Sequence, residues 1–87
     1  MDRAHDRQVD ESLAFAARRF DDRREQIEME FRHSDAFRSL CRDYLICAKA
    51  REKWQSSDSP IAAKREVEYA EWLTELENEI HDWLERL

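Results

Sequence analysis

Apolar side chains recur along this chain at intervals of three, four and seven residues, the spacing that places them on one face of an α-helix. The pattern predicts three helices, at about residues 9–32, 35–55 and 60–86. The third has the most regular, heptad-like register. The first has the narrowest stripe, because no apolar residue stands between Phe20 and Ile27, and we expect that turn to be loosely packed or solvated.

The residues predicted to face the interior are mostly large and apolar. They are Val9, Leu13, Ala16, Ala17, Phe20, Ile27 and Phe31 in the first helix, Phe37, Leu40, Cys41, Tyr44, Cys47, Ala48 and Trp54 in the second, and Ala62, Tyr69, Leu73, Leu76, Ile80, Trp83, Leu84 and Leu87 in the third. The free energy gained by burying this set barely offsets the conformational entropy lost when the chain becomes ordered. Burial against a partner or a second copy is therefore expected.

Two polar breaks separate the predicted helices. Ser34 can cap the second helix, with Asp35 at its positive end. In the stronger break, Ser59 is expected to cap the third helix and Pro60 to take its first position. Such short connections favour consecutive helices that run antiparallel or at a sharp angle. We expect an all-α fold, a three-helix arrangement built on an antiparallel hairpin of the second and third helices with coiled-coil-like packing. Because the break at Ser34 is weak, the first two helices could instead form one kinked rod.

Composition narrows the class of protein. The length of 87 residues is that of a single helical domain, and we expect residues 1–8 to be a disordered N-terminal segment. The absence of glycine excludes phosphate-binding glycine loops and Rossmann turns. No apolar run approaches the roughly 18 residues of a membrane span, and no signal-peptide core is recognisable. A cytoplasmic location with Cys41 and Cys47 reduced is the simplest expectation.

The net charge of −6 is unevenly distributed along the chain. Residues 34–57 carry a net charge of +2, whereas residues 58–87 carry −6. At 100° per residue, four cations of the second helix fall within a sector of about 60° opposite its apolar face, and two apolar residues lie on or beside them. We expect this exposed cationic stripe to bind a partner, and the candidate residues are Arg38, Arg42, Leu45, Ile46, Lys49 and Lys53.

The third predicted helix carries a stripe of the opposite sign. Its members, on the side away from the apolar residues, are Glu68, Glu71, Glu75, Glu79 and Asp82. Like charges at this spacing repel one another, and a cationic partner would relieve that repulsion. Both stripes could instead be the solvated faces that soluble helices ordinarily have. Copies of the chain could also pair basic face to acidic face.

Other kinds of chemistry find little support in the sequence. No stacking platform or helix-turn-helix turn accompanies the basic stripe, so nucleic-acid binding is not expected. The three histidines lie in three different segments, and Cys41 is better explained as a small core residue than as a nucleophile. Glu77, His81 and Glu85 share the spacing of metal ligands, a pattern that helices rich in glutamate produce by chance. We predict no catalytic, cofactor-binding or metal site.

The sequence therefore indicates a small non-enzymatic module for protein–protein interaction: an adaptor, a regulatory subunit or a homodimeric scaffold that recognises its partner through helix faces. The partner would be another protein or a second copy, with no nucleic acid, membrane or small-molecule substrate. The alternative is a small chaperone-like protein that shields an amphipathic client segment. A third hypothesis is a metal-dependent or thiol-based activity at His81 or Cys41.

Overall fold

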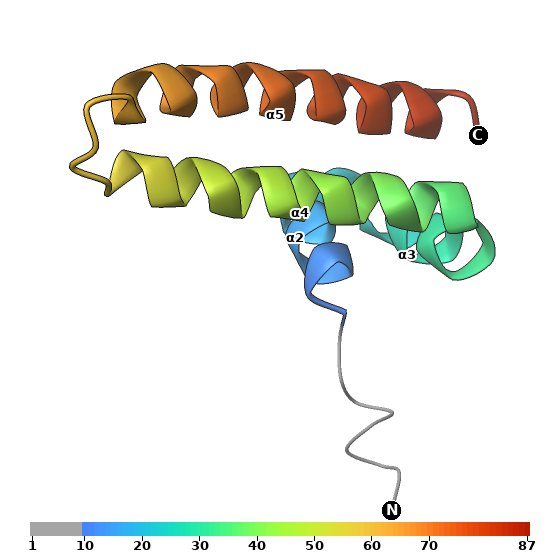
Figure 1. Ribbon diagram of the computed structural model, residues 1–87. Helices are drawn as coiled ribbons and strands as arrows, with labels where there is room; N and C mark the ends of the chain where they lie inside the picture. The colour runs from blue at the N-terminus through green and yellow to red at the C-terminus, as the bar shows by residue number, and fades with distance from the viewer. Residues whose placement is uncertain (1–9) are drawn as a thin grey trace, which may run out of the picture.

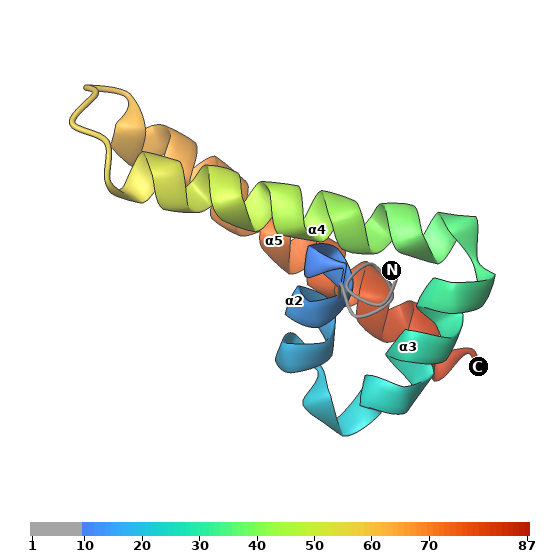
Figure 2. The ribbon, with the colours of Figure 1, turned by 90° about the horizontal axis from the view of Figure 1, so that it is seen from below.

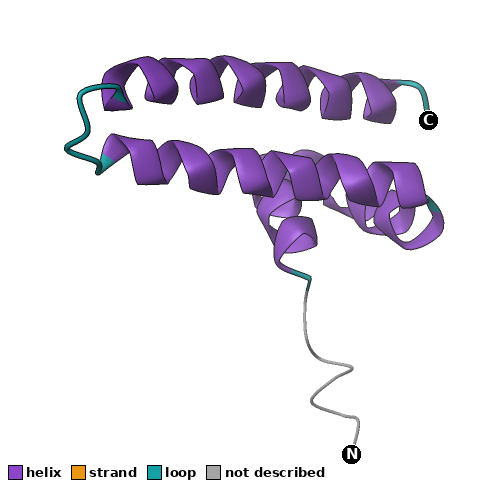
Figure 3. Cartoon of the chain, viewed as in Figure 1, coloured by secondary structure: helices purple, strands orange, loops and turns teal. Residues whose placement is uncertain are grey.

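The computed structural model describes residues 10–87, and every regular element in that range is a helix (Figures 1 and 3). In chain order these are α2 (Glu11–Arg19), a short 3₁₀ turn η1 (Asp21–Arg23), α3 (Arg24–His33), α4 (Asp35–Gln55) and α5 (Ala62–Glu85). The prediction of an all-α fold is confirmed. The predicted disorder of residues 1–8 and the place of Val9 in the first stripe lie outside the described residues.

The prediction of one continuous first helix is wrong. The helix ends after Arg19, and Phe20 leaves the helical region with φ −123° and ψ 56°. The 3₁₀ turn follows, and the chain becomes α-helical again at Arg24. The break falls where the apolar stripe is interrupted, because residues 21–26 offer no apolar side chain whose burial would favour continuing in the same direction. Two shorter helices result, and each buries its own apolar face.

Ser34 separates α3 from α4, so the alternative of a single kinked rod is also wrong. The backbone of Ser34 is extended, with φ −130° and ψ 116°. Its Oγ accepts a hydrogen bond from the N–H of Phe37 at 3.1 Å. This bond satisfies one of the N–H groups that the start of α4 leaves free. Ser34 thus has the capping role that the sequence predicts for it.

The start of α5 differs from the prediction by two residues. Pro60 and Ile61 form a turn, and the α-helix begins at Ala62. The prediction that Ser59 caps the helix is also wrong, since Ile61 is the N-cap and no side chain caps α5. Ser59 accepts hydrogen bonds of the preceding turn, through Oγ from Ile61 N at 3.4 Å and through its carbonyl from Ala62 N at 3.0 Å. Proline therefore precedes the α-helix and does not occupy its first position.

The two long helices, α4 and α5, lie side by side and run in opposite directions (Figure 1). The short helices α2 and α3 pack on α4, and both lie to one side of the α4–α5 pair (Figure 2). The connection between α4 and α5 projects beyond these two short helices (Figure 2). Within residues 10–87, the pair therefore has one face covered by helices and one face that no other helix covers.

The core lies where α2 and α3 meet the long helices. Its buried cluster consists of Ala16, Ile27, Phe31, Phe37, Cys41, Tyr44, Ile80 and Leu84. Two aromatic residues outside the cluster pack against rings within it. The ring centroids of Trp83 and Phe37 are 5.4 Å apart, and those of Phe15 and Tyr44 are 5.0 Å apart. The tilted geometry of both pairs is one that aromatic rings favour. All eight cluster residues belong to the set that the apolar spacing predicts to face inward.

Candidate interaction surface

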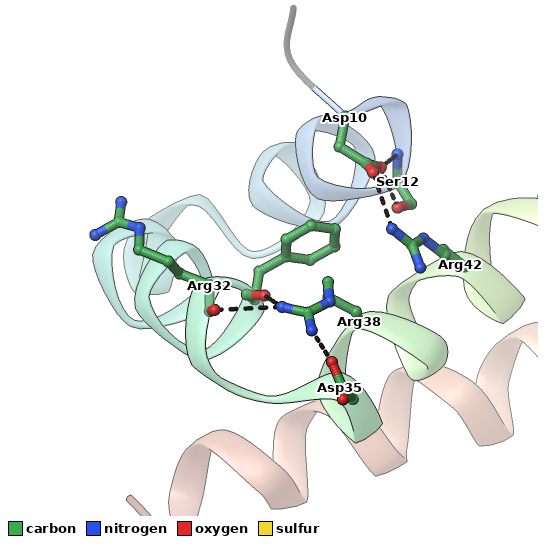
Figure 4. Close-up of polar contacts among 7 residues, drawn as sticks. Asp10, Ser12, Arg32, Asp35, Arg38 and Arg42 are labelled. Carbon is green, nitrogen blue, oxygen red and sulfur yellow. Dashed lines mark hydrogen bonds and ion pairs between the residues drawn. The ribbon is translucent and has the colours of Figure 1, made fainter. Parts of the chain in front are cut away.

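Arg38, the first residue of the predicted cationic stripe, stabilises the fold through contacts within the chain. Its Nη1 donates hydrogen bonds to the carbonyl oxygens of Phe31 at 2.7 Å and Arg32 at 3.2 Å, and its Nη2 forms an ion pair with Asp35 (Figure 4). The last carbonyls of α3 have no partner within their own helix. Arg38 supplies one, and it joins the end of α3 to the first turns of α4.

Two further cations of the stripe attach α2 to α4. The Arg42 Nη2 lies 3.3 Å from Asp10 Oδ2 (Figure 4), and the Lys49 Nζ lies 3.0 Å from Glu11 Oε2. Both carboxylates stand at the N-terminus of α2, where a negative charge also interacts favourably with the helix dipole. Arg42, Lys49 and Lys53 are exposed, as the pattern predicts, but Arg38, Arg42 and Lys49 also have acceptors in this chain, which the pattern does not show. Lys53 takes part in no ion pair among the described residues.

The two apolar candidates, Leu45 and Ile46, differ in exposure. Leu45 is half-buried, whereas the side chain of Ile46 is 65% exposed. One residue corresponds to 100° of helix rotation, which is enough to separate the edge of the packed side from the open surface. Ile46 lines a hollow on the outer surface of α4 together with Lys49 and Lys53. Of the six predicted residues, the structure brings these three together at an open surface.

The Asp10 carboxylate gives the attachment of α2 a dependence on pH. It caps α2 by accepting from Ser12 N at 2.9 Å, and its hydrogen bonds with Ser12 hold the pKa of Asp10 below its usual 3.8, with a smaller contribution from Arg42. A lowered folded pKa means that the charge stabilises the fold above about pH 4 and that this contribution is lost as the pH falls through the folded value.

We therefore expect Asp10→Asn, which keeps a capping oxygen and removes the charge, to lower the free energy of unfolding by about 0.5–1 kcal/mol at pH 7. The difference from the wild type should shrink as the pH falls below about 4 and vanish once Asp10 is protonated. Urea denaturation of both proteins between pH 7 and pH 3 measures this. A difference that does not change with pH would contradict the assignment to the charge.

A different surface lies on the uncovered side of the α4–α5 pair. A hollow of about 340 Å³ opens there, lined by Asp43, Ile46, Cys47, Tyr69, Trp72, Glu75, Leu76 and Glu79. The ring of Trp72 meets that of Tyr69 edge-on at 4.9 Å, and the Trp72 side chain is 51% exposed. The hollow thus combines an apolar lining with carboxylates and contains no cation.

A second hollow continues the first along the same two helices. It is lined by Ala36, Leu40, Glu79, Asp82, Trp83 and Arg86, so that Glu79 belongs to both. We call the two hollows together the α4–α5 groove. About 140° of helix rotation separates Cys47, in the groove, from Arg42, which contacts α2. The groove and the covered face therefore occupy different sides of α4.

The acids of the groove have few ion-pair partners in this chain. Among the described residues, Asp43, Glu75 and Glu79 take part in no ion pair, and Asp82 lies 3.8 Å from His81 Nδ1. Three acids of α5 outside the groove each have an arginine of this chain nearby: Glu66 pairs with Arg51 at 2.7 Å, Glu77 with Arg19 at 3.0 Å and Glu85 with Arg23 at 2.9 Å. Four of the five acids of α5 outside the groove thus have an arginine partner, Glu71 being the exception, whereas no acid of the groove has an arginine or lysine partner among residues 10–87.

The sequence pattern identifies only part of this groove. Glu75, Glu79 and Asp82 of the predicted acidic stripe line it, whereas Glu68 pairs with Arg65 at 2.9 Å. The contributions of Asp43, Tyr69 and Trp72 are not predicted. The position of Trp72 on the flank of the apolar stripe is the one sequence signal that points to an aromatic residue at an exposed edge.

Two of the side chains considered for catalysis and metal binding, Cys41 and Glu77, are buried or already hydrogen-bonded within the fold. Burial raises the pKa of the Cys41 thiol to about 12, so that it stays protonated at neutral pH and is a poor nucleophile. Glu77 already accepts hydrogen bonds from Arg19 and Tyr44. Within residues 10–87, no three His, Cys, Asp or Glu side chains are placed to hold a metal ion.

The comparisons with known proteins give no indication of function. The chain matches no protein-family model, no curated protein and no solved structure. Among the helices of residues 10–87, none has both the length and the apolar character needed to cross a membrane. Inference about function therefore rests on the surfaces described above.

Proposed function

We propose that the chain is a small, non-enzymatic, cytoplasmic module that binds a protein partner through a helix face, and that the α4–α5 groove is the contact surface. Its scaffold would be the α4–α5 pair acting as an antiparallel helical hairpin with coiled-coil-like packing. The observation that carries the proposal is the exposure of Trp72 and Ile46 at an apolar hollow. Large side chains of this kind, gathered in a concave site, are typical anchors of protein interfaces.

The proposed contact surface differs from the predicted cationic stripe. Three cations of that stripe hold the chain together, and Ile46 is the predicted residue that also lines the groove. A partner seated in the groove would cover Trp72 and Ile46 without breaking an ion pair of the fold. The remaining contacts around these anchors would supply shape and exclude water.

The experiment places a photo-crosslinking derivative of phenylalanine, which keeps an aromatic ring in the groove, at position 72 of the full chain, and at position 67 as the matched control. The chain is expressed in cells of its own source. Val67 lies on the same helix, is 52% exposed and does not line the groove. We expect a discrete crosslinked protein at position 72 and none at position 67. Equal crosslinking at both positions, or none at either, would contradict the proposal.

Trp72→Ala is expected to weaken binding of the crosslinked protein by about thirtyfold, which corresponds to a hot-spot loss of about 2 kcal/mol. Because Trp72 is half exposed, the free energy of unfolding should fall by no more than about 1 kcal/mol. Isothermal titration of the wild type, Trp72→Ala and the control Val67→Ala measures the first quantity, and urea denaturation measures the second. Binding unchanged in Trp72→Ala would place the contact elsewhere.

A further inference from the structure

The groove has a marked imbalance of charge. Its lining contains four acids, Asp43, Glu75, Glu79 and Asp82, and one cation, Arg86. Arg86 lines only the second hollow. The charged residues of the first hollow, which contains Trp72, are therefore all acids. The repulsion among these acids is not relieved by any arginine or lysine ion pair within residues 10–87. A cationic occupant would be attracted to the groove and would relieve that repulsion.

The shape of the groove suits an elongated occupant. It follows the seam of two antiparallel helices, and its lining along α5 extends from Tyr69 to the C-cap residue Arg86. At 1.5 Å per residue this distance is about 26 Å, the length of a helix of about 17 residues. The seam between two helices is a surface into which the side chains of a third helix pack. On the other face of the pair, α2 and α3 of this chain pack on α4 (Figure 2).

The lining also determines what the occupant must present. Cys47 is buried and Leu76 half-buried, and we take these two as the apolar floor of the hollow; the indole of Trp72 and the carboxylates of Asp43, Glu75 and Glu79 are exposed around it. An apolar stripe at positions i, i+4 and i+7 would cover the floor, and lysine or arginine residues beside that stripe would meet the acids. The half-exposed indole of Trp72 could also receive a cation over its ring.

On these grounds, and resting on the proposed function, we propose that the partner of the α4–α5 groove is a cationic amphipathic helix of another protein. The acids of the groove select that helix by charge, and the apolar floor supplies most of the affinity. The chain itself has a net charge of −6, so that a second copy would bring further negative charge to an acidic groove. Charge therefore favours a heterologous partner over self-association.

The test uses three synthetic peptides of about 18 residues that share one stripe of leucines at helical spacing and differ in the flanking residues, which are lysine, glutamine or glutamate. Each is titrated into the full chain, and the fluorescence anisotropy of a labelled peptide gives the Kd. We expect the lysine peptide to bind at least tenfold more tightly than the other two. The preference should decrease at about 0.5 M salt, where exposed charges are strongly screened.

Charge-reversing variants locate the effect. Glu75→Lys/Glu79→Lys should weaken binding of the lysine peptide at least tenfold and improve binding of the glutamate peptide. The matched control, Glu28→Lys/Asp58→Lys, changes the net charge equally at two exposed acids outside the groove and should leave the Kd within about twofold. Trp72→Ala should weaken the binding of every peptide that binds in the groove.

Each other outcome overturns the inference. If both charge-reversing variants weaken binding equally, the lysine peptide responds to net charge alone. If the glutamine or glutamate peptide binds as tightly and depends on Trp72, the groove is an interaction site for another class of helix, and the proposed function stands without this inference. Self-association that Glu75→Lys/Glu79→Lys abolishes, measured by sedimentation, would make a second copy the occupant. If no peptide binds, this inference fails, and crosslinking at position 72 decides the proposed function independently.

Discussion

Phe37→Ala is expected to lower the free energy of unfolding by about 3–5 kcal/mol, the usual cost of replacing a fully buried phenylalanine by alanine. Phe37 has no exposed surface, and its ring lies 5.4 Å from that of Trp83. It stands in the first turn of α4, beside the corner that Arg38 and Ser34 hold together. A chain of this length has a total stability of roughly 4–13 kcal/mol, so that the variant would lose a large share of it.

Urea denaturation followed by circular dichroism measures this loss. The control is Met29→Ala, because Met29 is apolar, lies on α3 and is 57% exposed. We expect the control to change the stability by about 0.5 kcal/mol or less. A loss in Phe37→Ala no larger than that in the control would show that the cluster around Phe37 is not the core.

The core of this protein could be predicted from the sequence because burial follows the helical period. Phe37, Cys41 and Tyr44 recur at intervals of four and three, Ile80 and Leu84 are four residues apart, and all five are buried. The spacing of apolar residues predicts which side of a helix is buried, and this prediction does not depend on which element that side packs against. The existence of α4 and its cap at Ser34 follow from equally local signals.

The use of the charged residues could not be predicted in the same way. Arg42 and Asp10 are 32 residues apart in the chain, and the direction in which α2 returns to α4 depends on the break at Phe20. A helical wheel shows the cations of α4 as one stripe but cannot show that the first turn of α2 meets them. On the wheel the stripe therefore resembles a surface for a partner, although three of its four cations bind groups of this chain.

The groove was missed for a related reason. Its residues come from two helices, and Asp43 and Glu79 share a hollow only because α4 and α5 take one relative rotation. The apolar stripe of each helix indicates which of its sides is buried. It does not indicate how one helix is rotated relative to the other. Trp72 lies on the flank of the core stripe of α5, and the structure places that flank at the edge of the α4–α5 groove.

A chain of polar contacts also joins α2, α4 and α5, and it should be sensitive to its central residue. The Tyr44 hydroxyl donates a hydrogen bond to Glu77 Oε2 at 2.6 Å, and Arg19 Nε lies 3.0 Å from the same oxygen. Tyr44 is 1% exposed, and burial together with Glu77 raises the pKa of Tyr44, so that the hydroxyl remains a donor at neutral pH. Without Glu77 this donor would have no acceptor in a buried position.

Glu77→Ala is therefore expected to lower the free energy of unfolding by about 2–3 kcal/mol, the cost of a buried polar group left without its charged partner. Tyr44→Phe removes the donor instead, and the double variant removes both groups. Because the two residues act on one hydrogen bond, the loss in the double variant should be smaller than the sum of the single losses by about 1 kcal/mol or more. Urea denaturation of the four proteins measures this coupling, and losses that simply add would mean that the bond between Tyr44 and Glu77 contributes nothing of its own. A neighbouring pair on the same helices, Arg51 with Glu66, is more exposed and should show a coupling below about 1 kcal/mol, so that it serves as the reference for a surface contact.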